Sequence, residues 1–318
     1  MSFTASNKLP NVQVFLSTYN GERYIEQQLD SLLKQQDVNL YILIRDDGSE
    51  DNTLSILEQY TKTNNNMVTL LRGENIGAKA SFFELIKLAD QNYDFFAFCD
   101  QDDVWNMNKI KSAVPYIHNS CQNLPKLYCS ITSIVDEQLN FISKWPKPPV
   151  KSINLYNSLV ENTGVGCTMI FNKATLQLLQ DNLPKNMNKV AMHDWWVYLS
   201  VSAFGKVYFD DNSYISYRQH SGNLIGAGMQ GLIQTQIEKA KNFVRGTNKY
   251  LISSQAREFL DIYRPLLDQR EIKYIEKIAY CTDFNFVNRF IFLWSSPFYC
   301  QSTYKNLILK IKLVTGVI

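Results

Sequence analysis

The sequence predicts an α/β fold with a parallel sheet in its first half and a mostly helical C-terminal region. Apolar segments and helical patterns alternate four times over residues 12–99. The apolar segments are continuous, which is typical of strands buried on both faces of a parallel sheet. Polar and acidic residues follow the first, second and fourth segments, where an open α/β sheet places its ligand. With 318 residues, 45% of them hydrophobic, the chain is long enough for one large domain with an appendage.

Local patterns assign the elements in chain order. A helix from about Glu22 is indicated by Ile25, Leu29 and Leu32, which share one face at helical spacing. After Trp105 the alternation weakens. We expect strands at 12–17, 40–45, 67–71, 95–99, 126–135 and 165–171, a hairpin at 206–209 and 213–218, helices at about 22–33, 51–61, 79–89 and 106–119 and from 193, a proline-rich loop at 144–151, and helices from about 230 onward.

Composition and charge exclude several functions. The formal net charge of +2 gives no support for nucleic-acid binding. The six cysteines show no CxxC spacing, which suits a reducing cytoplasm better than a disulfide framework. Residues 1–11 lack the apolar core of a signal peptide, and segment 290–300 is too short to span a bilayer. No Ser-His-Asp arrangement, HExxH or P-loop is evident, and three histidines do not favour a His-rich zinc site.

Three carboxylates, Asp100, Asp102 and Asp103, follow the fourth strand directly. Charges so close together repel one another, and a divalent cation with oxygen ligands would offset them. Mg²⁺ or Mn²⁺ at this point would in turn bind a diphosphate. The alternative interpretation is a solvated acidic turn that caps the helix starting near Asn106.

A second acidic turn, Asp46-Asp47-Gly48-Ser49, follows the second strand. A carboxylate there can accept a hydrogen bond from the imide N–H of uracil or thymine, or from ribose hydroxyls. The alternative is a plain turn from strand to helix, with Asp51 as the helix N-cap. The acidic cluster two strands later favours the first interpretation.

Two later segments combine reactive and aromatic side chains. In HDWW at 193–196, Asp194 could take a proton from an acceptor hydroxyl while tryptophan faces pack on sugar rings; the alternative is a helix N-cap with the tryptophans in the core. In YRQH at 217–220, His220 could bind a metal and Arg218 a phosphate, or both could be structural. The segment 226–231 matches GxGxxG but does not follow a parallel strand, so we interpret it as a flexible loop that could close over substrate.

Together these motifs resemble the family 2 glycosyltransferases with the GT-A fold, a Rossmann-like nucleotide-diphospho-sugar transferase domain. DQDDVW, HDWW and YRQHxxN look most like the rhamnosyltransferase-type branch that builds bacterial cell-surface polysaccharides. Many members have Glu-Asp at the base motif, where this chain has His193-Asp194. The matching pieces, in the family's order, are FLSTYNG at 15–21, IRDDGSEDNT at 44–53, NIGAKASF at 75–82, FCDQDDVW at 98–105, ENTGVGCTMIFN at 161–172, MHDWW at 192–196 and YRQHSGN at 217–223.

The resemblance implies a role for each matching residue. Asp194 would be the catalytic base of a single inverting displacement, and Asp100 with Asp102 would form the DxD element that meets metal and diphosphate. The full assignment is Thr18, Tyr19, Asn20, Asp46, Asp47, Asp100 and Gln101 on the donor nucleotide, His193, Trp195, Trp196 and Arg218 in the acceptor or sugar pocket, and Asp102, Asp103 and His220 on Mg²⁺ or Mn²⁺.

The branch resemblance implies dTDP-L-rhamnose as the donor and a lipid-linked glycan as the acceptor. A UDP-hexose or UDP-N-acetylhexosamine donor is the alternative within the same fold. A catalytically silent nucleotide-sugar binding module is a more remote one. A Rossmann-type dehydrogenase is disfavoured, because residues 17–21 do not form the Gly-rich turn that a dinucleotide needs after the first strand.

The C-terminal region has a one-sided charge bias. Beyond Asp283 there is no acidic residue, while Arg289 and three lysines alternate with aromatic and aliphatic residues. Such segments can lie on an anionic membrane surface, although they can also pack on the main domain. We expect a GT-A domain at 1–228, a helical and membrane-associating region at 229–318, and a cytoplasmic protein at the inner face of the cell membrane.

Overall fold

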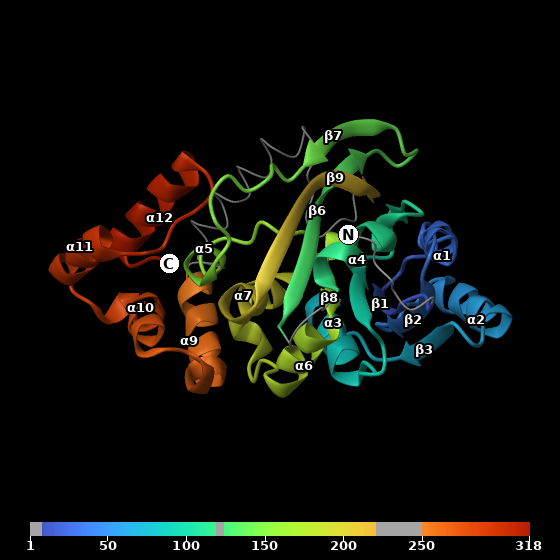
Figure 1. Ribbon diagram of the computed structural model, residues 1–318, viewed down its shortest axis with the longest axis horizontal. Coiled ribbons are helices and arrows are strands. Elements are labelled where there is room, and N and C mark those ends of the chain that lie inside the picture. Colours follow the sequence, from blue (N-terminus) through green and yellow to red (C-terminus); the bar gives the residue numbers. More distant parts are fainter. Residues whose placement is uncertain (1–7, 119–123, 221–249) are drawn as a thin grey trace.

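The computed structural model describes residues 8–118, 124–220 and 250–318. Within these ranges nine strands form one mixed sheet with helices on both faces (Figure 1). The strand order is β3-β2-β1-β4-β8-β6-β9-β5, and β7 pairs with β6. The strands are β1 Asn11–Thr18, β2 Asn39–Asp46, β3 Val68–Arg72, β4 Phe95–Cys99, β5 Val104–Trp105, β6 Lys126–Val135, β7 Phe141–Trp145, β8 Ile170–Asn172 and β9 Lys206–Arg218. The helices are α1 Ile25–Leu33, α2 Thr53–Thr63, α3 Ala78–Leu88, α4 Lys109–Ile117, α5 Leu155–Ser158, α6 Lys173–Asp181, α7 His193–Phe204, α9 Leu251–Tyr263, α10 Gln269–Ala279, α11 Phe286–Ser295 and α12 Thr303–Thr315.

The first four strands confirm the predicted parallel sheet. β1 pairs in parallel with β2 and β4, and β2 pairs in parallel with β3. Their side chains alternate between two hydrophobic clusters. Phe15 and Phe98 pack on the face covered by α3, while Val14 and Leu16 pack on the face covered by α1 and α2. Because helices cover both faces, these strands are apolar throughout.

Beyond β4 the sheet becomes mixed. β8 lies antiparallel to β4 and to β6, whereas β9 runs parallel to β6. The hairpin predicted within residues 206–218 is wrong, because these residues form one continuous strand along β6. The turn signal at 210–212 marks a register shift in that pairing. Asp210 accepts hydrogen bonds there from the Asn212 backbone N–H at 2.8 Å and from the Tyr128 hydroxyl at 2.7 Å.

The strand predicted at 165–171 is shorter than expected. Gly166–Thr168 forms a 3-10 turn, and pairing begins only at Ile170. The Thr168 hydroxyl donates to Val165 O at 2.8 Å and stabilises this turn. The segment before β8 is therefore free to approach the carboxyl end of β4 as a turn.

The C-terminal helices pack on the sheet through α7. The Trp196 ring lies against Phe259 and Tyr263 of α9, with centroid separations of 5.8 and 5.9 Å. One hydrophobic cluster continues from the sheet into α9, α10, α11 and α12. The predicted boundary between residues 228 and 229, and the loop at 226–231, lie outside the described residues. Among the residues described, no helix has the length and apolar character needed to cross a bilayer.

Candidate functional site

Gln101 joins the loop after β4 to the loop after β1. Its Oε1 accepts hydrogen bonds from Thr18 Oγ1 at 2.6 Å and Tyr19 N at 2.9 Å, and its Nε2 donates to Tyr19 O at 3.1 Å. Gly21 leaves space for this amide, because a Cβ at Gly21 would collide with it. The ends of β1 and β4 therefore form one surface, as predicted for neighbouring parallel strands.

The loop after β2 is held against the same surface. Asn20 N donates to Ser49 Oγ at 2.9 Å, and Glu50 N donates to Asn20 Oδ1 at 2.9 Å. The φ of Asn20 is 48°, a left-handed conformation that asparagine adopts more readily than most residues. Asp46 accepts from the backbone N–H of Ser49 at 3.0 Å and from its hydroxyl at 2.5 Å. Three loops expected to bind the donor nucleotide are thus brought together.

Asp47, the second carboxylate of this turn, supports the site from within the protein. It is 2% exposed. Its carboxylate forms an ion pair with the buried Arg45 and accepts from Ile76 N at 2.9 Å and Gly77 N at 2.8 Å. Asp47 therefore fixes the loop that precedes α3, and its oxygens are already used by the protein.

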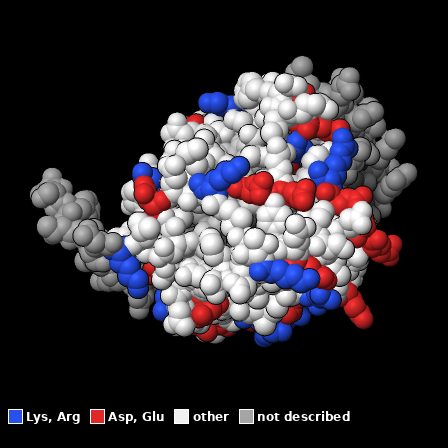
Figure 2. Space-filling model, turned by 90° about the vertical axis from the view of Figure 1, so that its right-hand side faces the viewer, with Lys and Arg blue, Asp and Glu red and all other residues white. Residues whose placement is uncertain are grey.

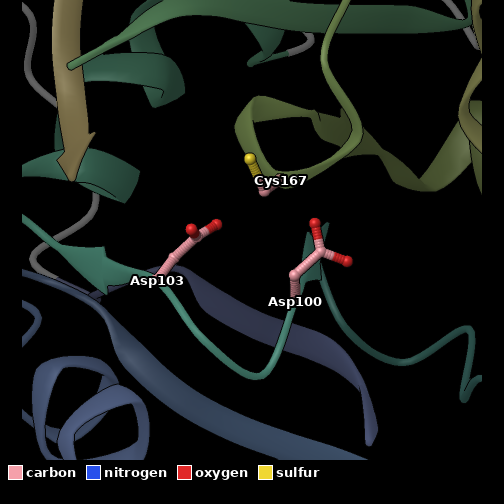
Figure 3. Close-up of side chains that lie close together, drawn as sticks. All are labelled: Asp100, Asp103 and Cys167. Carbon is pink, nitrogen blue, oxygen red and sulfur yellow. The ribbon is translucent and has the colours of Figure 1, made fainter. Parts of the chain in front are cut away.

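Asp100, Asp103 and Cys167 point toward one another at the carboxyl end of β4 (Figure 3). Their side-chain oxygen and sulfur atoms lie within 4.8 Å of one another. Burial, with the negative charge of Asp102, raises the pKa of Asp100 to about 7 and raises the pKa of Asp103 well above its ordinary value. Both carboxyls therefore lose their protons less readily than an exposed aspartate does.

Asp102 makes a different contact. His220 Nε2 lies 2.8 Å from Asp102 Oδ2, and each of the two side chains is 13% exposed. The imidazole packs on the ring of Tyr24, with centroids 4.9 Å apart. Asp102 and His220, which are separated by 118 positions, are thus neighbours at the edge of the acidic cluster.

Arg218 braces the loop that carries the acidic cluster. Its Nε donates to Asp102 O at 2.9 Å, and its backbone N donates to Asp103 Oδ1 at 3.1 Å. The buried guanidinium also donates to Glu137 O and to Gln27 Oε1, both at 2.5 Å. From the sequence we expect Arg218 in the sugar pocket or on a phosphate. In the structure these contacts instead hold the Asp102–Asp103 loop against α1 and the β6–β7 connection.

Asp194 lies in the first turn of α7, close enough to Asp100 for its charge to raise the pKa of that residue. Its Oδ1 accepts from Trp195 N at 2.7 Å, and it also accepts hydrogen bonds from the Gly166 backbone and the Asn162 side chain. Burial is the largest influence and raises the pKa of Asp194 to about 6, while the hydrogen bonds lower it. A carboxylate with a pKa near neutrality is suited to accept a proton at physiological pH.

The other side chains of the HDWW segment face inward. The His193 ring stacks on Phe82 with centroids 4.0 Å apart, and burial lowers the pKa of His193 to about 3, so the imidazole is neutral. Neither of its ring nitrogens has a hydrogen-bond partner among the described residues. Trp196 belongs to the core beneath α9. Trp195 is half-buried, and its Nε1 donates to Ser158 O at 2.7 Å.

The side chains at the edge of the cluster fit a divalent cation. A carboxylate oxygen suits Mg²⁺ and Mn²⁺, and neutral imidazole is a common metal ligand. Asp102 and His220 retain some exposure and lie side by side, so a carboxylate oxygen and an imidazole nitrogen would both be available to a cation at this edge. Asp103 is fully buried and already accepts from the Arg218 backbone. The spacing of Asp100, Asp103 and Cys167 would also allow a metal.

Three side chains at the site were not predicted from the sequence: Lys109, Cys167 and Asn162. The buried Lys109 lowers the pKa of Asp100, and burial lowers the pKa of Lys109 itself to about 7. When protonated, Lys109 places a positive charge inside the protein beside carboxylates that were expected to depend on a bound cation. Cys167 and Asn162 lie in the segment ENTGVGCTMIFN, so that motif was the signal for them, although it did not indicate their contacts.

A parallel half whose strand ends gather acidic side chains, joined to a second half that adds the buried carboxylate of Asp194, is the arrangement of a GT-A glycosyltransferase. The chain belongs to glycosyl transferase family 2, whose model matches residues 13–178, and it is a glycosyltransferase. Asp194 and His220 lie beyond the matched segment.

Individual relatives and solved structures agree with this family. The dTDP-rhamnosyl transferase RfbG of Shigella flexneri is 33% identical over 229 residues, which cover 67% of this chain and 74% of the relative. The UDP-Glc:alpha-D-GlcNAc-diphosphoundecaprenol beta-1,3-glucosyltransferase WfgD of Escherichia coli is 28% identical over 192 residues, 60% of this chain and 69% of the relative. The crystal structure of S. aureus TarS 1-349 in complex with UDP-GlcNAc has a TM-score of 0.55 and 19% identity, and covers 96% of this chain and 81% of that one. That likeness shows the fold.

Proposed function

We propose that this chain transfers L-rhamnose from dTDP-L-rhamnose to a lipid-linked glycan in the synthesis of a bacterial surface polysaccharide. The observation that carries the chemistry is Asp194, whose pKa is raised to about 6 by burial beside the strand-end acidic cluster. The donor is inferred from RfbG, a dTDP-rhamnosyl transferase. The acceptor class is inferred from WfgD, whose name specifies a diphosphoundecaprenol-linked sugar.

The loops after β1 and β2 bind the nucleoside in this proposal. Asp46 accepts a hydrogen bond from the base or from the ribose, and Tyr19 offers an exposed ring beside it. Gln101 sets the position of this loop through its bonds to Thr18 and Tyr19. Asp47 acts indirectly, by fixing the loop before α3.

Asp102 and His220 would hold Mg²⁺ or Mn²⁺, with Asp100 beside them. When bound, the cation would stabilise negative charge on the departing nucleoside diphosphate. Lys109 limits the negative charge that accumulates beneath this position. Arg218 keeps the cluster's loop in place through its contacts with Asp102 and Asp103.

The transfer itself is a single displacement. Asp194 removes the proton of an acceptor hydroxyl while that oxygen forms a bond to the anomeric carbon. The bond from this carbon to the diphosphate oxygen breaks on the opposite face, so the configuration inverts. Asn162 and Gly166 orient the carboxylate. With a pKa of about 6, Asp194 is mostly ionised at pH 7 and ready to act as the base.

A UDP-hexose donor is the second candidate, and the specific observation in its favour is the similarity to WfgD, a UDP-Glc-dependent relative. Both candidates use the same side chains.

The proposal also places the protein at the inner face of the cell membrane, with a GT-A domain at 1–228 and a helical region at 229–318.

Equilibrium binding of dTDP and UDP, each with and without Mn²⁺, tests the proposal. We expect metal-dependent dTDP binding in the wild type, loss of that binding in Asp102→Ala, and retention in the control Asp211→Ala, whose exposed side chain lies on β9 away from the cluster. A preference for UDP would move the donor to the second candidate. Failure of the folded protein to bind either nucleotide would refute the transferase proposal.

A further inference from the structure

The helix α11 presents an apolar face to solvent. Phe286, Val287, Phe290, Ile291 and Trp294 recur at the spacing of one helical stripe. All five are exposed, with Trp294 at 81% and Phe286 at 63%. The opposite side of the helix is the one that packs, since Phe292 is buried there. A water-soluble surface rarely concentrates so many large apolar side chains without a binding partner.

The next helix, α12, continues this pattern. Tyr304, Leu307, Ile308 and Ile311 are exposed at i, i+3, i+4 and i+7, while Leu309 and Leu313 are buried on the other side. At 100° per residue, the three lysines of α12 fall on the two flanks of the exposed stripe, with Lys310 on one flank and Lys305 and Lys312 on the other. The exposed Lys310 can extend its ammonium group toward an anionic surface while its stem lies along the apolar stripe, whereas Lys305 pairs with Glu161 and Lys312 is half-buried. α11 and α12 contact each other, and we call their exposed stripes the α11–α12 surface.

The charge of this region differs from that of the rest of the molecule. After Asp283 the chain has four basic residues and no acidic one. The end of the protein that carries α1 and α2 shows acidic and basic side chains side by side (Figure 2). In Figure 1 the α11–α12 surface lies at the opposite end of the long axis from that mixed-charge face.

We propose that the α11–α12 surface docks on an anionic lipid bilayer by inserting its aromatic and aliphatic side chains at the interface. Helices with one apolar face and lysines at its borders bind membranes in this way. A second copy of the chain fits less well, because neither stripe carries an acidic residue and a symmetric contact would therefore offer no carboxylate from the stripes to the exposed Lys310. This docking rests on the proposed function, because the bilayer is the surface that would present the lipid-linked acceptor.

The surface is connected to the catalytic side of the molecule. Lys305 of α12 forms an ion pair with Glu161 at 2.5 Å, and Gln301 N donates to the same carboxylate at 2.6 Å. Glu161 directly precedes Asn162, which hydrogen-bonds Asp194. Docking through α12 would therefore keep the segment that carries Glu161 and Asn162 next to the membrane-bound helix.

Co-sedimentation with vesicles of phosphatidylglycerol and phosphatidylcholine tests the docking. We expect wild type to bind vesicles rich in phosphatidylglycerol more strongly than pure phosphatidylcholine vesicles, and the double variant Ile291→Ser with Trp294→Ser to bind at least about tenfold more weakly. Lys310→Glu should weaken binding only to the anionic vesicles. Phe141→Ser is the control, because Phe141 is a large apolar side chain of similar exposure, 63%, but lies on β7.

Two results would overturn the docking proposal. One is equal vesicle binding by the wild type and the Ile291/Trp294 variant, with both shown to be folded by thermal melting. The other is a wild-type dimer in solution that this variant dissociates, which would assign the surface to a second copy. Metal-dependent dTDP binding by the same variants should be unchanged, so a failure of docking is distinguishable from a failure of the proposed transferase activity.

Discussion

Replacement of Asp194 by asparagine should lower activity and raise stability together. Loss of a general base costs about 10²- to 10⁴-fold in rate. The amide keeps the size of the carboxylate, and its oxygen can still accept from Trp195 N. The structure gives no reason for misfolding, so the loss should be in the turnover rate of a folded protein.

The stability effect follows from the pKa. Burial raises the pKa of Asp194 from 3.8 to about 6, so the folded state binds this proton more tightly than the unfolded chain does. Above pH 6 the ionised group therefore destabilises the fold. At about 1.4 kcal/mol per pH unit, the shift corresponds to at most about 3 kcal/mol. Because the Asp194 side chain is half-buried, solvent screening reduces the expected effect to about 1–2 kcal/mol. The cost disappears as the pH falls below 3.8, where both states are protonated.

Two assays check this prediction. Sugar transfer is measured at pH 7.5, and urea unfolding is measured at pH 7.5 and at pH 4. We expect Asp194→Asn to be more stable than wild type at the higher pH, with a much smaller difference at the lower one. Asp211→Asn, an exposed aspartate with no contact of this kind, should change neither property. Full activity in Asp194→Asn would refute the base assignment, and unchanged stability at pH 7.5 would refute the buried-charge reasoning.

Three further predictions concern the same site. The wild-type turnover rate should fall about tenfold per pH unit below pH 6 as Asp194 becomes protonated; a flat profile between pH 5 and 8 would contradict this. Gly21→Ala should force Gln101 away from its partners and weaken dTDP binding, and it should lower the unfolding free energy by about 1–3 kcal/mol. Calorimetric titration measures the dTDP affinity and urea unfolding measures the stability; wild-type values in both assays would contradict the close contact between Gly21 and Gln101. Asp47→Ala should leave Arg45 buried without its carboxylate and cost about 3–5 kcal/mol of unfolding free energy; a loss below about 1 kcal/mol would show that the pair matters little.

The first half of the fold could be predicted because its signals are local. Continuous apolar runs of strand length, each followed by polar turns, placed β1, β2, β3 and β4 within a few residues. The same logic brought Asp46, Asp100 and Gln101 to one surface, since neighbouring parallel strands end at the same edge. These inferences need only chain order and the period of the pattern.

The second half depends on pairings that no local pattern contains. Residues 210–212 have the composition of a turn. In the structure they form an irregularity within one long strand, because β6 pairs with the residues before and after it. The helix predicted over Lys109 is confirmed, but its pattern does not indicate that tertiary packing buries this lysine beside the carboxylates. Arg218 likewise matched a ligand-binding motif, and only the fold shows that Asp102, Asp103 and Gln27 occupy its donors. Contacts between distant segments decided each of these cases.

The insertion of the antiparallel strand β8 between β4 and β6 has an evolutionary consequence. The residues proposed to contact the nucleoside follow β1, β2 and β4, whereas the proposed base and its hydrogen-bond partners belong to the segment before β8 and to α7. The two halves are linked by Arg218 and His220 at the end of β9, which contact the loop of the acidic cluster. A chimaera that joins one relative through α4 to another from β6 onward should therefore take its nucleoside preference from the first parent and its acceptor from the second, as long as residues 218 and 220 of the second parent still fit the acidic loop of the first.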